Sequence, residues 1–421
     1  MKIESQCIHG GYTPSNGEPS ALPIYQSTTF RYTSTDEVAK LFDLEAAGFF
    51  YSRLANPTVD AVERKIAALE GGVAALATSS GQAAVFTTVV TIAKAGDHIV
   101  ASSSIYGGTF NLLGTSLKRL GIDITFVNQK DSDEELDKAF RPNTKLVLGE
   151  TLANPALTVL DIERFAKLAH RHNVPLVVDN TFATPFLCRP FEYGADIVVH
   201  STTKYMDGHA IQLGGVIVDS GNFDWTCGNF PEFTEPDESY HGTIYTKAFG
   251  RQAFIVKARA QVIRDFGCLQ TAQGAFYLDL GLQSLPVRMA AHCRNAEQVA
   301  AFLEGHEKVA HVLYPGLPSS PDHALAQKYL PRGTAGVISF TLKGGRDAGA
   351  RFIDALKMIM LEVHVADIRT CVLHPASSTH RQLSDSQLVE CGIEPGMVRL
   401  SVGLENVQDI LDDLAQALDR A

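Results

Sequence analysis

The stretch that most constrains this chain runs from residue 175 to 218, where two short apolar segments each end in polar residues. Residues 176–178 read Leu-Val-Val and lead to Asp179, and residues 197–199 read Ile-Val-Val and lead towards Lys204. Short runs of Val and Ile bounded by polar turns are typical of buried strands in a mainly parallel sheet. Ligands of such sheets bind beyond the carboxyl ends of the strands. We therefore expect Asp179 and Lys204 to face one crevice.

An acid and an amine in one crevice suit a particular cofactor chemistry. An unprotonated lysine amine forms a Schiff base with a carbonyl group. Pyridoxal phosphate (PLP) uses such a lysine, and a carboxylate on its ring nitrogen lets the ring accept electrons. The hydroxyls of Ser201 and Thr203 lie beside Lys204 and suit a phosphate group. Taken alone, Lys204 also fits an exposed lysine in a polar loop, but Asp179 and the hydroxyls favour the cofactor site.

Composition narrows the class of protein. The chain has 421 residues, of which 45% are hydrophobic and 20% charged, as in a globular protein of about two or three domains. Its net charge of −11 is unfavourable for binding nucleic acid or an acidic membrane surface. The first residues contain no apolar signal segment, and no run approaches the length of a membrane span. Seven scattered cysteines without a C-x-x-C pair predict no disulfides and no metal site, so we expect a cytoplasmic enzyme.

Strand and helix signals divide the chain into three parts. Residues 1–57 are rich in Gly, Pro, Ser and Thr and predict an extended arm that contributes to a neighbouring subunit's site. Residues 58–250 alternate strands and helices, which predicts a large doubly wound α/β domain. Residues 251–421 begin with long amphipathic helices and then alternate again. They predict a helical connection and a smaller C-terminal α/β domain.

Periodicity and turn residues predict the individual elements. Strands are expected at residues 73–77, 98–101, 123–127, 145–148, 176–178, 197–199, 336–342 and 397–402. Helices are expected at 58–69 with Thr58 as N-cap, and at 83–93, 108–120, 133–140, 162–172, 249–266, 282–303, 347–358 and 406–421. Residues 219–246, which contain Trp225, break this rhythm and predict a lid or an interface segment.

Further polar residues follow other predicted strands. Gly81 and Gln82 lie between a strand and a helix, where free N–H groups favour a phosphate, although an ordinary turn fits them equally. Tyr106 suits stacking on a cofactor ring or proton transfer, with an interfacial tyrosine in a glycine turn as the alternative. Glu150 and Asn154 follow the strand at 145–148 and are expected in the same crevice. Asn154 suits a hydrogen bond to a ring hydroxyl, and loop capping is its alternative.

Arg399 stands alone inside an apolar segment. A buried charge is costly without a partner. The carboxylate of a substrate, bound through two parallel hydrogen bonds, would be such a partner. A structural salt bridge is the alternative.

Together these motifs resemble the Cys/Met-metabolism PLP-dependent enzymes, the family of cystathionine γ-synthase, the cystathionine lyases, methionine γ-lyase and O-acetylhomoserine sulfhydrylase. The resemblance covers nearly the whole chain and rests on motifs at residues 51–53, 56–58, 80–84, 178–181, 201–205, 374–377 and 399–403. It implies the type I, aminotransferase-like fold of PLP-dependent transferases. It also implies a homotetramer built from two active-site dimers.

The resemblance implies a role for each residue of the site. Within the subunit, the PLP phosphate would be held by Gly81, Gln82, Ser201 and Thr203. Tyr51 and Arg53 would reach the phosphate of the neighbouring subunit.

The remaining roles concern the ring and the substrate. Tyr106 would stack on the ring, Asp179 would pair with its nitrogen, and Lys204 would join the cofactor and move protons. Asn154 would also contact the cofactor. By the resemblance, Arg399 would bind the substrate carboxylate. Glu150, from its place after a strand, and His364, which departs from the family pattern, are also expected to bind substrate.

Within the family, the segments 230–242, 248–250 and 254–259 are similar to O-acetylhomoserine sulfhydrylases. Methionine γ-lyases carry a cysteine where Gly108 lies, which counts against that activity. Two positions depart from the family pattern. The family usually has Ser or Asn followed by Gly-Asp where this chain has His364, Ala366 and Asp367. It also usually has Asn at the position of Gly274.

The implied reaction is γ-replacement, in which O-acetyl-L-homoserine and sulfide (or a thiol) give L-homocysteine (or methionine) and acetate. The partners would then be small molecules, not nucleic acid or a membrane. A lyase or a cystathionine γ-synthase-type transferase of the same family is the main alternative. A non-catalytic binding protein and a nicotinamide dehydrogenase are further alternatives, the latter weakened by the missing G-x-G-x-x-G motif. The sequence leaves open acetyl against succinyl as the leaving group, and sulfide, methanethiol or a sulfur-carrier protein as the donor.

Overall fold

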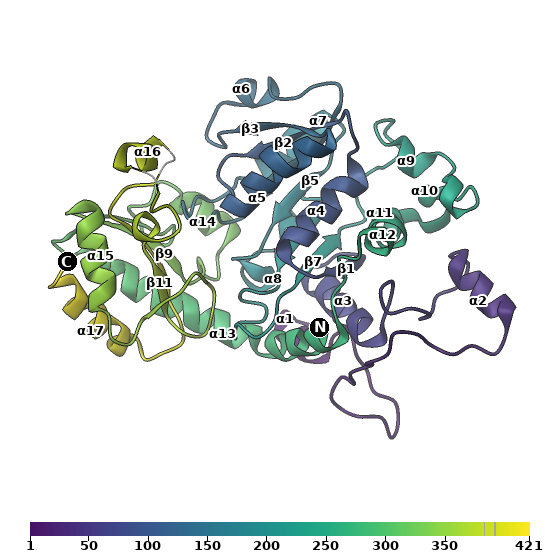
Figure 1. Cartoon of the computed structure of the whole chain (residues 1–421), viewed down its shortest axis with the longest axis horizontal. Coiled ribbons are helices and arrows are strands. Elements are labelled where there is room, and N and C mark those ends of the chain that lie inside the picture. The colour runs from purple at the N-terminus through teal and green to yellow at the C-terminus, as the bar shows by residue number, and fades with distance from the viewer. Residues whose placement is uncertain (383, 391–392) are drawn as a thin grey trace.

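The computed structural model describes residues 1–382, 384–390 and 393–421 of the chain. In this part of the chain, a seven-stranded and a five-stranded sheet each carry their own hydrophobic core. The larger sheet lies in the middle of Figure 1 and the smaller one at the end where α15 and α17 pack. The long helix α13 (Ala272–Glu304) runs from one to the other and contributes side chains to both cores.

The larger sheet has the strand order β1-β7-β6-β5-β4-β2-β3. Its strands are β1 (Ala74–Thr78), β2 (His98–Ser102), β3 (Asp123–Val127), β4 (Thr144–Glu150), β5 (Leu176–Asp179), β6 (Ile197–Ser201) and β7 (Gly215–Asp219). The neighbouring strands β3, β2, β4, β5 and β6 pair in parallel. Strand β7 is antiparallel to both β1 and β6. The predicted mainly parallel sheet is confirmed, and β7 was not predicted.

Parallel pairing brings the carboxyl ends of three strands to one edge of this sheet. Glu150 at the end of β4 is the register partner of Asp179 at the end of β5. Asp179 in turn pairs with Val199 of β6, so Lys204 lies in the turn beyond the next strand. The apolar residues of β5 and β6 are fully buried because helices cover both faces of the sheet.

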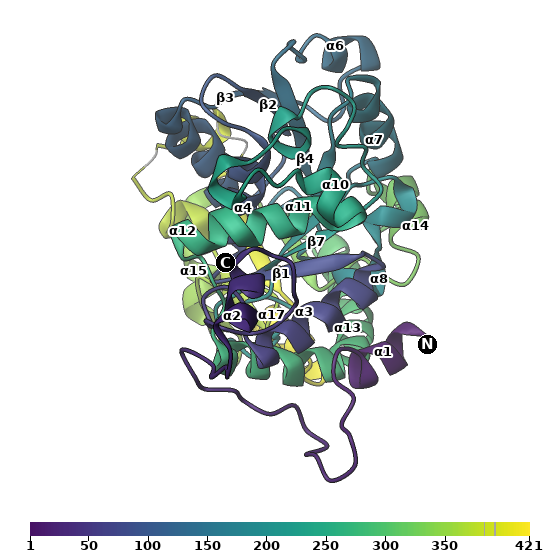
Figure 2. The same cartoon turned by 90° about the vertical axis from the view of Figure 1, so that its right-hand side faces the viewer.

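Helices pack on this sheet from both sides. Figure 2 shows α4 and α7 on opposite sides of the strands, where α4 contacts β6 and β7 and α7 contacts β4 and β5. The helices of this part are α3 (Pro57–Glu70), α4 (Gly81–Ile92), α5 (Gly107–Asn111), α6 (Asp133–Asp137), α7 (Ile162–Arg171), α8 (Thr184–Leu187), α9 (Pro231–Thr234), α10 (Tyr245–Phe249), α11 (Ala253–Lys257) and α12 (Arg264–Phe266).

Several predicted helix boundaries are wrong. Asn56, not Thr58, caps α3, because its side chain accepts a hydrogen bond from the Thr58 N–H and Pro57 occupies the first helical position. Helix α13 begins well before residue 282 and continues through Pro286. Proline disfavours a helix interior, but extensive burial along α13 outweighs that preference. Helix α6 ends at Asp137, and α15 (Gly345–Ala355) begins and ends earlier than predicted.

Two other predicted helices are irregular. The segment predicted at 108–120 passes from α5 into a π-helical turn at Leu112–Ser116 and a 3-10 turn at Leu117–Leu120. The segment predicted at 249–266 contains a π-helical turn at Ala258–Ile263 between α11 and α12. Apolar periodicity predicts that a helix exists but not which hydrogen-bond spacing it adopts.

The smaller sheet has the order β10-β11-β12-β9-β8 and mixes parallel and antiparallel pairs. Its elements are β8 (Val309–Leu313), β9 (Val337–Leu342), β10 (Met360–Leu361), β11 (Cys371–Leu373) and β12 (Met397–Ser401), with α14 (His323–Tyr329), α15 (Gly345–Ala355), α16 (Asp385–Glu390) and α17 (Val407–Leu418). The predicted strands β9 and β12 and helices α15 and α17 are present. Strands β8, β10 and β11 were not predicted, since they are short or only partly buried.

The first part of the chain is only partly an arm. Helix α1 (Ile3–His9), which was not predicted, packs on α3 and α13 and buries Ile3 and Cys7. The segment that follows, with α2 (Thr35–Phe42), projects from the body at the lower right of Figure 1. The domain boundaries at residues 57 and 250 stay a prediction.

Trp225 of the predicted lid segment is buried and stacks on Phe233 and Phe254, with ring centroids 4.3 and 5.6 Å away.

Six cysteines carry free thiols, and the seventh, Cys391, lies outside the described residues. Among the helices that the structure describes, none combines the length and apolarity needed to cross a bilayer.

Candidate active site

Lys204 lies in the turn that follows β6. The turn is closed by backbone hydrogen bonds from the Lys204 N–H to Ser201 O and from the Gly208 N–H to Lys204 O. The Lys204 side chain is partly buried, and its Nζ lies 3.3 Å from Nδ1 of His364. Burial and the neighbouring Arg399 charge lower the pKa of Lys204 to about 8. The amine therefore loses its proton, and becomes a nucleophile, far more easily than an exposed lysine.

Asp179 ends β5 and is held by Thr181. The backbone N–H and the hydroxyl of Thr181 both donate to Oδ1 of Asp179, and the same hydroxyl accepts from the Ser201 N–H. Burial raises the pKa of Asp179, while the two Thr181 donors and the His200 charge oppose that rise. Thr181 was not among the predicted site residues. A hydroxyl two residues after an acid at a strand end is the signal that predicts such a turn.

Glu150 and Tyr106 meet beside Asp179. The Tyr106 N–H donates to Oε1 of Glu150 at 2.7 Å, so the carboxyl end of β4 positions the tyrosine. Burial, and then the charge of Asp179, raise the pKa of Glu150 well above its usual range. The Tyr106 side chain remains 48% exposed, which leaves its ring accessible to a ligand.

Arg399 projects from β12 of the smaller sheet towards the ends of the larger one. Its Nη1 donates to Oδ1 of Asn154 at 3.2 Å and its Nη2 to the backbone oxygen of His364 at 3.5 Å. Within the described residues its Nε is buried without a hydrogen-bond partner. Both acceptors are uncharged, so they do not neutralise the guanidinium of Arg399. Its positive charge remains available to an anionic ligand. Asn154, which was predicted to contact the cofactor, accepts a hydrogen bond from Arg399 in this structure.

The N-terminus of α4 lies against the end of β6. The Ser80 side chain caps α4 by accepting from the Ala83 N–H, and α4 begins at Gly81. A Cβ on Gly81 would lie 2.6 Å from Cβ of Ser201, so only glycine lets the end of β6 approach so closely. The first N–H groups of a helix have no partner within the helix and attract phosphate. The Thr203 hydroxyl, by contrast, bonds to the backbone of Gly214.

Gln82 and Tyr106 meet at Gly108. A Cβ on Gly108 would lie 2.5 Å from Cε1 of Tyr106 and 2.9 Å from Nε2 of Gln82. The structure thus brings together two residues that the sequence assigned separately to the phosphate and to the ring. Gly108 lies directly against both side chains.

Tyr51 and Arg53 make other contacts in this chain. The Arg53 guanidinium lies over the Tyr51 ring at 5.1 Å from its centroid, and Nη1 of Arg53 donates to the Arg264 backbone oxygen at the start of α12. Tyr51 is 38% exposed. A role for this pair in a neighbouring subunit stays a prediction.

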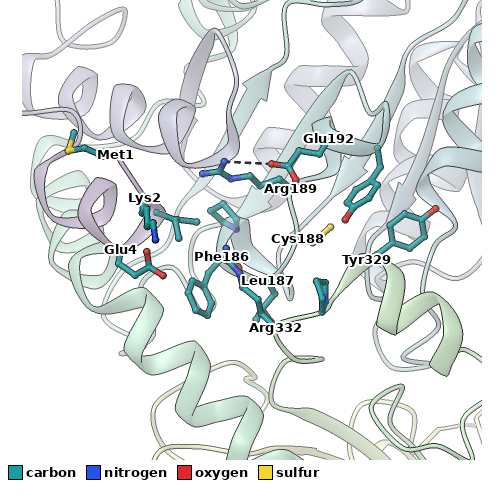
Figure 3. Close-up of a pocket in the computed structure, with 14 residues that line it drawn as sticks. Met1, Lys2, Glu4, Phe186, Leu187, Cys188, Arg189, Glu192, Tyr329 and Arg332 are labelled. Atoms are coloured by element: carbon teal, nitrogen blue, oxygen red, sulfur yellow. Dashed lines mark hydrogen bonds and ion pairs between the residues drawn. The ribbon is translucent and has the colours of Figure 1, made fainter.

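A separate cavity lies elsewhere on the surface. Figure 3 shows this space of about 500 Å³ between the start of the chain and residues 185–193. Met1 and Lys2 line one side, and Arg189 and Glu192, joined by an ion pair at 3.7 Å, line the other. It contains none of the predicted site residues.

The residues at the crevice fit PLP. The positive helix end and the glycine contact at Ser201 suit a phosphate, the Asp179 carboxyl suits a ring nitrogen, and the Lys204 amine suits an aldehyde. A lysine and an acid that follow neighbouring parallel strands, in a sheet with this strand order, define a PLP-dependent enzyme of fold type I.

Comparisons with known proteins make this assignment more specific. The family model described as "Cys/Met metabolism PLP-dependent enzyme" matches residues 4–419, so the chain belongs to this family. It is 46% identical to the O-acetyl-L-homoserine sulfhydrylase of Leptospira meyeri, over 99% of this chain and 97% of that protein. It is also 46% identical to the homocysteine synthase of Schizosaccharomyces pombe, over 100% of this chain and 98% of that protein.

A solved structure supports the same fold and cofactor. The structure described as an O-acetylhomoserine (thiol)-lyase from Campylobacter jejuni superimposes with a TM-score of 0.95 and 36% identity, over 100% of both chains. Its description includes a pyridoxyl phosphate joined to a lysine. The predicted family, type I fold and PLP dependence of the present chain are therefore confirmed.

Proposed function

We propose that this enzyme catalyses γ-replacement on O-acetyl-L-homoserine. Sulfide displaces the acetoxy group at Cγ, giving L-homocysteine and acetate, and methanethiol in place of sulfide gives methionine. The observation that carries the proposal is the likeness over the full chain length to several enzymes named for this reaction, with the lysine, acid and arginine of the site all present. The Gly108 position supports the same choice over methionine γ-lyase.

PLP bound at this site supplies an electron-accepting ring that stabilises negative charge next to the amino acid's α-carbon. Lys204 is the residue that moves protons. Its pKa of about 8 leaves part of the amine unprotonated near neutral pH, so Nζ can remove a proton from carbon and return it later. The partial burial of this amine also limits the access of water to the reacting atoms.

The two carboxyl groups of the site, Asp179 and Glu150, would be in different protonation states. Asp179 carries two donors from Thr181 and would be ionised against a protonated ring nitrogen, because an opposite charge favours the carboxylate. Glu150, whose pKa is raised, would remain protonated beside it. Its hydrogen bond from the Tyr106 N–H holds the tyrosine where its ring can stack on the cofactor.

Arg399 would bind the α-carboxylate of the substrate. Its unpartnered Nε and its contact with Asn154 support this role, since a bidentate arginine–carboxylate pair fixes the orientation of an amino acid. His364 would line the same end of the site.

The proposed assembly of subunits follows from the resemblance to the family. We propose a homotetramer of two active-site dimers, in which Tyr51 and Arg53 of one subunit complete the phosphate site of the next. The exposure of Tyr51 and the projection of the arm support this arrangement. We propose a cytoplasmic location, three parts bounded at residues 57 and 250, and free sulfide or a thiol as donor, with a sulfur-carrier protein as the alternative.

The purified, PLP-loaded enzyme tests the reaction directly. Incubated with O-acetyl-L-homoserine, it is expected to release homocysteine only when sulfide is present, and O-succinyl-L-homoserine is expected to react more slowly. Lys204→Ala should remain folded and lose both activity and the yellow colour. Release of α-ketobutyrate from methionine alone, at a rate matching or exceeding homocysteine formation, would overturn the proposal in favour of a lyase.

A further inference from the structure

His364 lies between the catalytic lysine and a buried acid. Its Nδ1 is 3.3 Å from Nζ of Lys204, and its Nε2 is 3.9 Å from Oδ2 of Asp367. The Asp367 side chain is fully buried, and Nε2 of His364 is buried without a hydrogen-bond partner among the described residues. The imidazole therefore has one nitrogen on the amine and the other nearest to a carboxylate.

The proton positions on this histidine follow from its two neighbours. A protonated lysine amine has three N–H donors and no acceptor, so Nδ1 of His364 must accept from it. The neutral imidazole then carries its proton on Nε2, facing the Asp367 carboxylate. Burial and the charge of Lys204 lower the pKa of His364 to about 4, which keeps the ring neutral. The lysine amine thus selects the tautomer, and the Asp367 carboxylate 3.9 Å away favours the proton on Nε2.

The segment that carries His364 is held rigidly. Asp367 accepts hydrogen bonds from the Arg369 backbone N–H at 2.9 Å and from its guanidinium at 3.0 and 2.8 Å. Ala366 has a φ of 65°, and its N–H donates to the Ser401 hydroxyl at 2.7 Å. The backbone oxygen of His364 accepts from the Cys371 thiol as well as from Arg399. This turn therefore fixes the ring against Lys204.

We infer that His364 is a positioning residue for Lys204, which accepts a hydrogen bond from its amine through Nδ1 whenever that amine is not joined to the cofactor. The inference deepens the proposed function and rests on it, because it assumes that Lys204 is the residue that moves protons. A serine hydroxyl at this position can both donate and accept, whereas this tautomer of histidine can only accept. The amine must therefore direct an N–H at the ring and its lone pair elsewhere, towards the side where a substrate carbon would lie.

A matched pair of variants separates this hydrogen bond from simple packing. His364→Asn keeps an acceptor oxygen close to the place of Nδ1, and His364→Leu keeps a side chain of similar depth without an acceptor. Val363→Ala serves as a control, because Val363 is in the same segment but 75% exposed. Thermal unfolding of all three variants shows whether each remains folded.

The first measurement is the pKa of the Lys204 amine in the cofactor-free enzyme. Acetylation of Lys204 by acetic anhydride, followed by mass spectrometry across a pH series, reports this pKa without using PLP or activity. The charged and titratable groups facing the pair are Arg399 from β12, Cys371 from β11, and Asp367 and Arg369 from the His364 segment. None of these is changed by the variants.

The pKa of Lys204 is expected to change more in His364→Leu than in His364→Asn. Loss of a charge-assisted hydrogen bond destabilises the protonated amine, so His364→Leu should lower the pKa of Lys204 by about one unit or more. His364→Asn and Val363→Ala should leave it within about half a unit of the native value. Equal pKa values in His364→Leu and the native enzyme would overturn the inference, as would an equal shift in His364→Asn and His364→Leu.

Kinetics of the loaded enzyme provides the second measurement. His364→Leu should reduce kcat about tenfold while KM for O-acetyl-L-homoserine changes less than about threefold, and His364→Asn should recover most of kcat. A rise in KM with unchanged kcat would contradict the inference, because it would assign His364 to substrate binding. Failure of the proposed reaction remains distinguishable, since the acetylation experiment reports on Lys204 whichever substrate the enzyme uses.

Discussion

Glu150 and Asp179 end neighbouring parallel strands as register partners, and the charge of Asp179 helps to raise the pKa of Glu150. Two carboxyl groups that share a buried edge cannot both ionise freely. Thr181 donates twice to Asp179, which favours its ionised form. Glu150 also receives backbone donors, but it is only 6% exposed, and burial with the Asp179 charge outweighs them. We conclude that Glu150 holds the proton and Asp179 the charge.

This pairing predicts how stability depends on pH. The pKa of Glu150 is higher in the folded state than its ordinary value of 4.5. The stabilisation that the protonated Glu150 contributes is therefore complete below a pH of 4.5. The contribution is lost as the pH rises through the raised pKa. Glu150→Gln, which cannot ionise, should therefore become more stable relative to the native enzyme as the pH increases. Each unit of raised pKa corresponds to about 1.4 kcal/mol.

Urea unfolding at mildly acidic and mildly alkaline pH measures this difference. Glu238→Gln, at an exposed position, is the matched control and should show little pH-dependent change. A Glu150→Gln enzyme that loses as much stability as the native enzyme on going to alkaline pH would show that Glu150 is ionised in the native fold.

Two adjacent glycines provide a test of the Tyr106 position. Gly108→Ala places a Cβ 2.5 Å from Cε1 of Tyr106 and forces the ring to move, whereas a Cβ on Gly107 meets nothing within 4 Å. Stacking of an aromatic ring contributes about 0.5–1.5 kcal/mol. Gly108→Ala should therefore weaken PLP binding by about two- to tenfold, and Gly107→Ala should leave it unchanged. Absorbance titration of the cofactor-free variants with PLP gives both dissociation constants. Equal weakening in both variants would argue against stacking by Tyr106.

Thr181 is expected to control the charge of Asp179. Thr181→Val removes the hydroxyl that donates to Asp179 and accepts from the Ser201 N–H, while its shape is nearly unchanged. A hydrogen bond to a charged group contributes about 1.5–3 kcal/mol, so kcat/KM should fall at least about tenfold near neutral pH. Thr181→Ser, which keeps the hydroxyl, should retain most of kcat/KM. Comparable losses in the two variants would indicate that the methyl group, not the hydroxyl, is what matters.

Ala366 is expected to be strained. Its φ of 65° lies in the left-handed region, which costs a residue with a Cβ about 1 kcal/mol. Ala366→Gly should therefore raise the free energy of unfolding by up to about 1 kcal/mol. Ala301→Gly, at an exposed position inside α13, should change stability by a similar amount in the opposite direction. Denaturant unfolding compares the two, and a loss of stability in Ala366→Gly would show that the alanine methyl is packed, not strained.

The sequence predicted the site where chemistry and local pattern coincide. Apolar runs that end in polar residues located β5 and β6, and the same runs led to Asp179 and Lys204. The glycine at the start of α4 and the arginine inside β12 were recognisable because each breaks a local preference. Such residues can be read along the chain without knowing its path in space.

Other features depended on contacts between distant segments. The continuation of α13 through Pro286 and the antiparallel direction of β7 follow from burial against the rest of the protein. Strands β8, β10 and β11 lack a strong pattern of their own. They form because β9 offers hydrogen bonds to β8, β12 offers them to β11, and β11 in turn pairs with β10.

By itself, the sequence determined which residues are chemically suited to hold PLP and which family the chain belongs to, because both depend on residue type and spacing. Only the tertiary structure decided that His364 touches Lys204 and that Asn154 contacts Arg399, across 160 and 245 residues of chain. Desolvation and neighbouring charges set the pKa values of Lys204 and Glu150. Glu150 meets its neighbour Asp179 when β4 and β5 pair, and Lys204 meets Arg399 when the two sheets pack together.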